Sequence, residues 1–246
     1  MNDRERFLAV AAFEEPDYVP IFGFPGAPGM SGGCMRKTHE RLVETGMPPD
    51  VGGSISVGSG RRDVESWQRY WGTTGPIGPG FSVASGAEGV RSTRRVEGDY
   101  EIIEYETGAV TRQLIDNSVT YSMPEFIEYP VRDRESWEFY RDRMTPREFM
   151  SEDEIEERGW DLREHNRPLF VPAGGAYSFV RGLMGPERAS MMFYDDPELI
   201  HEMVHWRLEQ MRKTIFPLVE KLQPDIVQMG EDLCYNHGMH ISPDQF

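Results

Sequence analysis

A long apolar stripe between two short apolar runs is the feature that most constrains the fold of this chain. From Asp196 to Leu222, apolar side chains recur at spacings of three and four residues, which predicts a helix with one face in the core. The runs PLFVPA (168–173) and DIVQM (225–229) flank it and predict buried strands. Strand, helices and strand in this order predict a βαβ unit with a right-handed parallel crossover. Pro217 lies inside the stripe and is expected to kink or divide the helix.

The first 132 residues follow a different pattern, which is rich in glycine and proline. Short helices are expected at 3–13 and 35–45, and an extended segment at 18–24. Between residues 91 and 116, polar residues alternate with β-branched or aromatic ones, with breaks near Gly98 and Gly108. This alternation predicts a small antiparallel meander near residues 90–115, inserted before the helix and strand alternation that begins at residue 133.

Composition excludes several kinds of partner. The 246 residues carry a formal net charge of −16, and such a surface repels phosphate backbones and anionic headgroups. No apolar run approaches the roughly 18 residues of a membrane span. Two cysteines are too few for a disulfide framework and are typical of a reducing compartment. The sequence therefore predicts a cytoplasmic protein that binds a small molecule, with neither nucleic acid nor a membrane as partner.

The densest group of ionisable side chains follows the second predicted strand and consists of Glu231, Asp232, Cys234, Tyr235, His237 and His240. Adjacent carboxylates can donate and accept protons, and a histidine can do the same near neutral pH, so Glu231, Asp232 and His237 are candidate catalytic residues. Side chains alternate along a strand, so only one of the two carboxylates is expected to enter a cavity. The alternatives are that the carboxylates cap a helix or pair with a loop arginine, and that the histidine only bonds to the backbone. Ser242-Pro243-Asp244 predicts another helix start.

A glycine turn, Gly174-Gly175, follows the first predicted strand. Glycines allow a ligand to approach the backbone, and the start of the next helix offers free N–H groups to an anion. An arginine one turn later could reach a carboxylate. The candidate substrate-binding residues are therefore Gly175, Tyr177, Ser178 and Arg181, together with Tyr235. The alternative is that the glycines only permit tight packing of the helix on the strand.

Two patterns suggest a metal site but are discounted. The segment HEMVH (201–205) matches the HExxH pattern of zinc proteases, but its histidines flank the apolar stripe instead of facing an open cleft. Cys234 and His237 have a Cys-x-x-His spacing without a second pair, so a packed thiol is expected there. No metal ligands are therefore assigned within the chain.

Four segments resemble the uroporphyrinogen decarboxylase superfamily, namely RERFLAVAAFEEPDYVPI, VPAGGAYSFVRGLMG, YDDPELIHEMV and PDIVQMGEDLCYNHGMHISPDQF. The resemblance implies an α/β fold, a TIM (β/α)8 barrel that is incomplete at its C-terminus and carries the meander as an insertion. It implies a single barrel domain over residues 1–246, with the meander in 1–132 and the βα repeats in 133–246. It also implies that the segment with Glu231, Asp232, Tyr235 and His237 points into the barrel mouth.

The superfamily contains decarboxylases and corrinoid-linked methyltransferases, and the residues favour the second. Decarboxylases grip the carboxylates of the porphyrinogen with an arginine-rich loop after the first strand. Here the strand leads into PGAPGMSGGC, and the first arginine after it is Arg36. The resemblance therefore implies methyl transfer from a small methylated donor to a corrinoid or thiol acceptor. It further implies a corrinoid protein as partner, and a zinc ion whose His-x-Cys and later Cys ligands would lie beyond Phe246.

Three alternatives stay open. The first is uroporphyrinogen decarboxylation in tetrapyrrole biosynthesis. The second is a non-catalytic protein that binds a tetrapyrrole or corrinoid under an aromatic roof of Trp67, Tyr70 and Trp71. The third is an inactive fragment that forms a homodimer or aggregates through an unpaired strand edge at 225–229.

Overall fold

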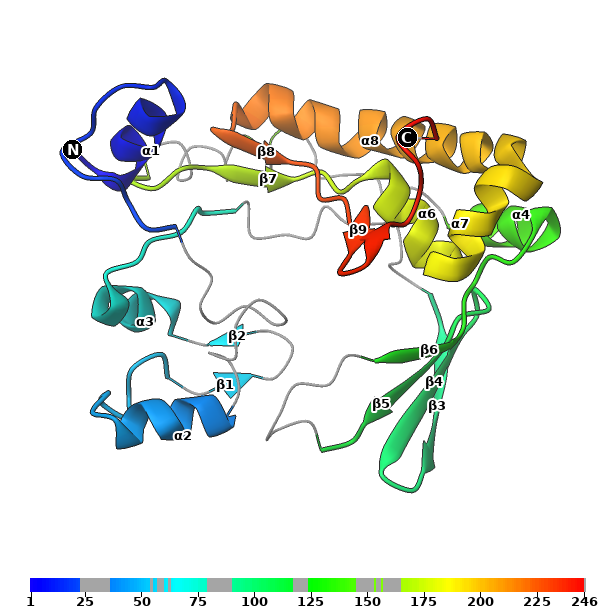
Figure 1. The fold of residues 1–246 in the computed structure, drawn as a ribbon, viewed down its shortest axis with the longest axis horizontal. Helices are drawn as coiled ribbons and strands as arrows, with labels where there is room; N and C mark the ends of the chain where they lie inside the picture. Colours follow the sequence, from blue (N-terminus) through cyan, green and yellow to red (C-terminus); the bar gives the residue numbers. More distant parts are fainter. Residues whose placement is uncertain are drawn as a thin grey trace.

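The computed structural model describes residues 1–22, 36–53, 55–56, 60–61, 63–78, 90–116, 124–144, 153, 156 and 165–245. Its helices are α1 (Asp3–Ala11), α2 (Arg36–Glu44), α3 (Val64–Trp71), α4 (Arg134–Arg143), α6 (Ala176–Met184), α7 (Pro186–Asp195) and α8 (Pro197–Leu222). Its strands are β1 (Ile55–Ser56), β2 (Gly60–Arg61), β3 (Ser92–Glu97), β4 (Tyr100–Tyr105), β5 (Val110–Leu114), β6 (Glu125–Glu128), β7 (Phe170–Pro172), β8 (Ile226–Gln228), β9 (Cys234–Tyr235) and β10 (Gly238–Met239). Figure 1 shows β7 and β8 lying along α8, with the β3–β6 sheet on the other side of the molecule.

The predicted parallel strand pair is confirmed. β7 and β8 pair in parallel, with Phe170 opposite Ile226, and α6, α7 and α8 connect them. The apolar stripe of α8 packs inward, because Leu169 and Val171 form a buried cluster with Met211 and other residues of the helix. Pro217 does not divide α8, which runs unbroken from Pro197 to Leu222. The helix is therefore not divided at this proline, and the kink that was the other expectation stays a prediction.

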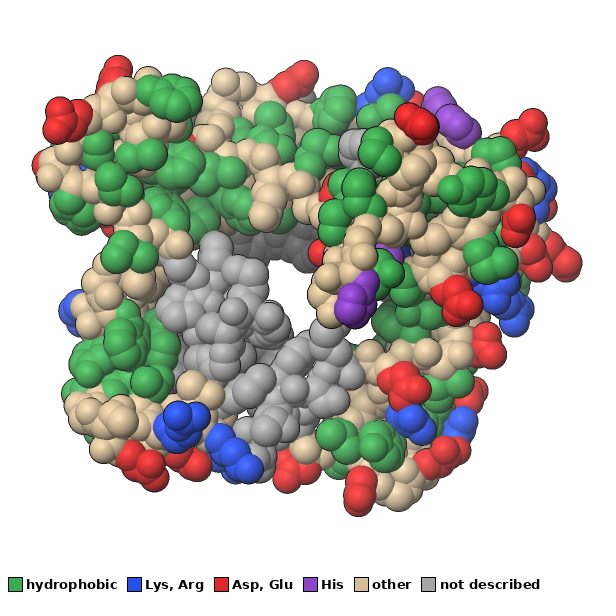
Figure 2. All heavy atoms as spheres, in the orientation of Figure 1, with side chains coloured by type: hydrophobic (Ala, Val, Ile, Leu, Met, Phe, Trp, Pro, Cys, Tyr) green, Lys and Arg blue, Asp and Glu red, His purple; other side chains and the backbone are tan. Residues whose placement is uncertain are grey.

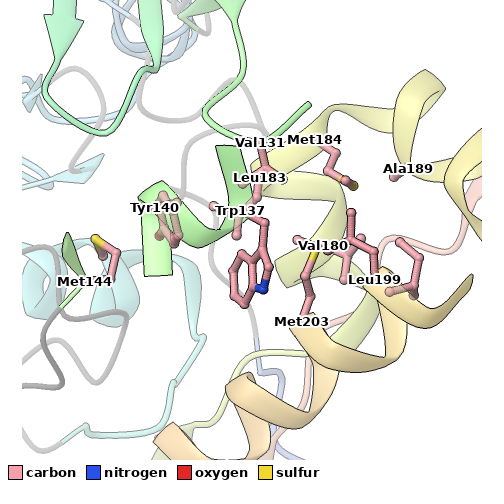
Figure 3. Packing of buried hydrophobic residues seen from close by; sticks show 11 residues of the cluster. Val131, Trp137, Tyr140, Met144, Val180, Leu183, Met184, Ala189, Leu199 and Met203 are labelled. Carbon is pink, nitrogen blue, oxygen red and sulfur yellow. The ribbon is translucent and has the colours of Figure 1, made fainter. Parts of the chain in front are cut away.

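A second core cluster joins α4 to the helices between β7 and β8. The indole ring of Trp137 is fully buried and lies among Val180, Leu199 and Met203, as Figure 3 shows. Its Nε1 donates a hydrogen bond of 2.9 Å to Glu202 of α8. This cluster fixes the position of α6, the helix that begins directly after the end of β7.

The N-terminal helix attaches to the start of the parallel pair. The guanidinium of Arg4 donates to the carboxylate of Asp225 at 2.9 Å, and the same carboxylate accepts from the N–H of Leu169 at 2.9 Å. The bond to Asp225 raises the pKa of Arg4 from its ordinary value. One carboxylate just before β8 therefore joins α1, the start of β7 and β8.

The TIM barrel implied by the sequence resemblance is contradicted. Within the described residues the largest sheet is antiparallel and has four strands, in the order β3-β4-β5-β6. In the part of the chain that the structure describes, parallel pairing is confined to β7 with β8 and to single bridges between Phe22 and Thr74 and between Ile77 and Leu169. A closed barrel needs eight parallel strands. The described part of the glycine-rich region 51–90 contains the helix α3, and its strand pairing is limited to isolated bridges and the two-residue strands β1 and β2.

The antiparallel meander predicted near residues 90–115 is present. β3, β4 and β5 pair in sequence order, and the turns between them contain Gly98 and Gly108, both with positive φ. β6 adds a fourth strand that the alternation pattern did not identify. Among the described residues this four-stranded sheet is the largest sheet, so the expectation that it is a small insertion in a barrel is wrong.

Other helix predictions hold with small changes. The first helix ends at Ala11 and the second spans Arg36–Glu44. Ser242-Pro243-Asp244 forms a turn, with the N–H of Ser242 donating to the side chain of Gln245, and the helix expected to continue from it lies outside the described residues. The segment PGAPGMSGGC, Cys34 and most of the helix expected after Ser151 lie outside the described residues. No helix of the described chain is long and apolar enough to cross a membrane.

Candidate functional site

The carboxyl ends of β7 and β8 meet at one edge of the parallel pair. The N–H of Ala173 donates to the carbonyl of Gln228 at 2.8 Å, which holds the two ends together. β7 continues through Gly174-Gly175 into α6, and β8 continues through Gly230 into Glu231. In parallel sheets ligands bind beside this edge. Both segments that the sequence selected as sites therefore lie side by side.

Glu231 caps the N-terminus of α6. Its carboxylate accepts from the N–H of Tyr177 at 3.1 Å and from the N–H of Ser178 at 2.7 Å. The N-cap residue, Gly175, has no side chain that could do this. A negative charge is favourable at this end of a helix, because the first N–H groups lack partners within the helix. The first N–H groups of this helix were expected to be free to bind an anionic ligand. Instead, two of them are paired with a carboxylate of the chain itself.

Asp232 also contacts α6. Its side chain forms an ion pair with Arg181, and its N–H donates to the Ser178 hydroxyl at 3.0 Å. The Asp232 side chain is 73 % exposed, whereas that of Arg181 is 30 % exposed. Strand alternation does not separate Glu231 from Asp232, because β8 ends at Gln228. The structure therefore brings both carboxylates to the same helix.

Arg207 was not selected from the sequence, although it lies behind the glycine turn. This α8 residue is 9 % exposed, and its guanidinium donates to the carbonyl of Ala173 at 2.9 Å. Burial lowers the pKa of Arg207 from its ordinary value. A Cβ at Gly174 would lie 3.0 Å from this guanidinium. A charged residue among the apolar positions 203, 204, 208 and 211 was the signal that could have identified it.

The remaining candidates, Tyr235 and His237, lie in the hairpin of β9 and β10, where several rings are in contact. The rings of Tyr235 and His240 stack at 5.2 Å, and His240 stacks on Tyr177 at 6.2 Å. His237 lies edge-on to Tyr235 at 5.8 Å and is exposed. Figure 2 shows that the surface is hollowed beside this hairpin and that a histidine lies at the edge of the hollow. No hydrogen bond to the His237 ring occurs among the described residues.

Tyr177 has two roles that the sequence did not separate. Its N–H belongs to the cap around Glu231, but its phenol ring is only 3 % exposed and lies against Phe193 of α7. Burial raises the pKa of the Tyr177 hydroxyl, while the nearby Ser190 hydroxyl and Arg181 act against this rise. The phenol is therefore buried among the helices, whereas Ser178 remains beside the two carboxylates.

The aromatic roof expected at Trp67, Tyr70 and Trp71 is in part a packing cluster. Trp67 is buried with Met47 and Val51. The rings of Tyr70 and Trp71 are in contact at 5.0 Å and are about two-fifths exposed. Only these two rings are accessible to a ligand.

The described residues do not supply a metal site. No three His, Cys, Asp or Glu side chains converge among them, and Cys234 is an exposed free thiol instead of the packed thiol expected. In HEMVH, Glu202 accepts from Trp137, Arg134 and Arg141, while His201 and His205 are exposed. This segment therefore links α8 to α4. The ligands that the resemblance implies for zinc would lie beyond Phe246, so the described residues do not test that expectation.

Comparisons of the chain with protein-family models, with curated proteins and with solved structures found no match.

Proposed function

We propose that the chain is a methyl-transfer enzyme whose reaction takes place where β7 and β8 end. The methyl group starts on a small methylated compound and passes to a corrinoid or a thiol. Where a corrinoid accepts it first, the thiol then receives it from the methylated corrinoid. The observation that carries the proposal is the shared edge at which Glu231, Asp232 and the hairpin with His237 follow β8 while α6 follows β7. Its reaction class rests on the sequence resemblance to corrinoid-linked methyltransferases.

An accessible base beside the site supports a reaction in which a proton must be removed from the acceptor. A thiol must lose its proton before its sulfur can attack a methyl carbon. His237 is exposed and its ring is not engaged by any hydrogen bond in the described chain, so we assign it the role of accepting this proton. When the methyl group comes from a methylated corrinoid, a sulfur–carbon bond forms as the carbon–cobalt bond breaks. The electron pair of the broken bond stays on cobalt.

The other residues hold and recognise the reactants. Glu231 fixes the segment after β8 to α6 through two backbone N–H groups, so we assign it a positioning role. Asp232 and Arg181 form an exposed pair that can exchange partners with a charged substrate group. Gly175 and Ser178 line the same edge, and the exposed ring of Tyr235 offers an apolar face. No step is assigned to zinc.

The reducing cytoplasm is the compartment that fits this reaction, since both a free thiol acceptor and an exposed Cys234 persist there. A corrinoid protein is the partner that we propose. A homodimer through the outer edge of β8 stays a second proposal, because Val227 and Met229 are exposed on that strand and just after it.

The proposal is tested by incubating the full chain with methylcobalamin and 2-mercaptoethanol without oxygen. The expected result is loss of the methylcobalamin spectrum and formation of the S-methyl thioether, detected by mass spectrometry, at a rate above the protein-free control. A parallel incubation with uroporphyrinogen measures release of carbon dioxide. Decarboxylation without methyl transfer would replace the proposed reaction, and binding of cobalamin without either reaction would favour the non-catalytic alternative.

A further inference from the structure

A pocket of about 740 Å³ lies at the opposite end of β7 from the candidate site. Its walls are formed by α3 and by the segments 75–78 and 165–167, and the second of these segments leads into the start of β7. Binding sites for small molecules have volumes of roughly 300–1,000 Å³. The pocket is therefore large enough for a small molecule, and the methyl transfer proposed above uses none of the residues that line it.

Hydrogen bonds hold the walls of this pocket together. The N–H of Ile77 donates to the carbonyl of Pro168 at 2.9 Å, which joins the two segments. The guanidinium of Arg167 donates to the side-chain oxygen of Gln68 on α3 at 3.3 Å. Gly75 leaves room for the amide of Gln68, since a Cβ at position 75 would lie 3.0 Å from the amide nitrogen. The position of Arg167 is thus supported by both other walls.

Arg167 brings a positive charge to the pocket without a carboxylate to balance it. The side chain is half-buried, and within the described residues its guanidinium bonds to Gln68 and forms no ion pair. A guanidinium presents five N–H donors in a planar fork that matches a carboxylate. The donors that Gln68 leaves unused can therefore bind the carboxylate of a ligand.

Negative charge lies on the wall that α3 provides. The carboxylate of Asp63 caps α3 and accepts from the N–H of Ser66 at 2.9 Å. Glu65 is exposed and forms no ion pair in the part of the chain that the structure describes. An ammonium group is the ligand group that matches this second carboxylate. The apolar part of the lining consists of Val64, Pro76 and Ile77.

We propose that this pocket binds a zwitterionic small molecule of the amino-acid type, whose carboxylate pairs with Arg167 and whose ammonium group pairs with Glu65. A ligand with both charges leaves neither residue without a partner. A simple anion would bring its charge near Glu65, and a simple cation would bring its charge near Arg167. The inference stands on the pocket and its two unpaired charges, so it does not depend on the reaction assigned to His237.

Three probes of similar shape test the proposal by isothermal titration calorimetry on the full chain, namely phenylalanine, phenethylamine and 3-phenylpropanoate. Phenethylamine lacks the carboxylate of phenylalanine, and 3-phenylpropanoate lacks its ammonium group. Phenylalanine should bind saturably and about tenfold tighter than phenethylamine, because Arg167 is half-buried. It should bind about threefold tighter than 3-phenylpropanoate, because solvent screens the exposed Glu65. Equal binding of the three probes, or no saturable binding of phenylalanine, overturns the proposal.

Removing the positive charge locates the carboxylate of the ligand. Arg167→Gln should bind phenylalanine no tighter than phenethylamine. The control Arg188→Gln should keep the tenfold preference, because Arg188 is exposed on α7, which Figure 1 shows on the other side of the molecule from α3. A preference that survives in a folded Arg167→Gln variant places the carboxylate elsewhere and overturns the inference.

Reversing the negative charge provides the second arm. Glu65→Lys should bind 3-phenylpropanoate more tightly than phenylalanine, because the ammonium group of phenylalanine then meets a like charge. The control Glu187→Lys, at an exposed position of α7, should keep the wild-type order of the three probes. Thermal unfolding checks that the variants fold, and if Arg167→Gln does not, the exposed Glu65→Lys decides alone. An unchanged order in Glu65→Lys overturns the inference.

Discussion

The carboxylate of Glu231 occupies the space that a side chain at Gly175 would need. A Cβ at position 175 would lie 2.2 Å from the carboxyl carbon of Glu231. The backbone of Gly175 is extended, with φ of −124°, so any larger residue here is opposed by the position of the Glu231 carboxylate and not by the backbone conformation. The relationship connects the turn after β7 to the segment after β8.

Gly175→Ala is expected to lower the free energy of unfolding by about 1–2 kcal/mol, because the displaced carboxylate no longer caps α6. Urea unfolding followed by circular dichroism measures the change. Gly182→Ala is the matched control, since it lies inside the same helix with nothing within 4 Å of an added Cβ. That variant should be unchanged or more stable by up to about 1 kcal/mol. Equal effects at the two glycines would contradict the account of the cap.

Combining Gly175→Ala with Glu231→Ala isolates the contact. Glu231→Ala alone should cost about 1–2 kcal/mol, because the N–H groups of Tyr177 and Ser178 lose their acceptor. In that background Gly175→Ala should have almost no further cost, since the group it displaces is gone. A double-mutant cycle in urea gives the coupling directly. Additive losses would mean that the two residues act independently.

Glu202, the glutamate of the HEMVH segment, holds α4 against α8. Its carboxylate accepts from Arg134, Arg141 and Trp137, although the carboxylate and both arginines are more than a third exposed. Glu202→Ala should therefore lower the free energy of unfolding by only about 1–2 kcal/mol, because solvent screens the ion pairs with the two arginines. Most of this loss comes from the indole N–H of Trp137, which is left unpaired. His205→Ala, on the exposed face of the same helix, should change stability by less than about 0.5 kcal/mol. A larger loss in the histidine variant, measured by chemical denaturation, would reverse this assignment.

Stability at alkaline pH depends on Tyr140. Burial raises the pKa of its hydroxyl to about 12. An unfolded tyrosine ionises near pH 10, so the contribution of the neutral hydroxyl is fully present below about pH 10 and is lost as the pH rises toward the folded value. Between pH 9 and pH 11, the free energy of unfolding of the wild-type chain should fall by roughly 1 kcal/mol more than that of Tyr140→Phe. Urea titrations of both proteins at the two pH values measure this change. If the gap in stability between the wild type and Tyr140→Phe is the same at pH 9 and pH 11, Tyr140 is not shielded from ionisation.

The local pattern of the sequence predicted the elements better than their assembly. The period of the stripe along α8 and the alternation from residue 91 to 116 are local signals, and both produced the expected structures. The barrel was inferred from the order of motifs, which does not report how strands pair. The described part of the glycine-rich region provides single bridges at Thr74 and Ile77 where a barrel needs strands.

The site shows the same division. The sequence pattern selected Glu231 and Asp232 after one strand and Ser178 and Arg181 after the other, but it did not predict the contacts between them. The pairing of Glu231 with the start of α6 joins residues 53 and 54 apart in sequence, and no local pattern contains that information. The buried ring of Tyr177 packs against Phe193 of α7, and no local sequence pattern predicts this contact.

The most direct test of the account is the rate of methyl transfer from methylcobalamin to 2-mercaptoethanol in wild type, His237→Gln and the control His205→Gln. The account predicts a rate roughly 10²-fold lower or more in His237→Gln alone. It also predicts that the deficit shrinks at alkaline pH, where the thiol ionises without a base, which a purely structural role of the histidine would not produce. Transfer that is equally fast in all three proteins would contradict the role of His237, and absence of transfer in the wild type would contradict the proposed reaction itself.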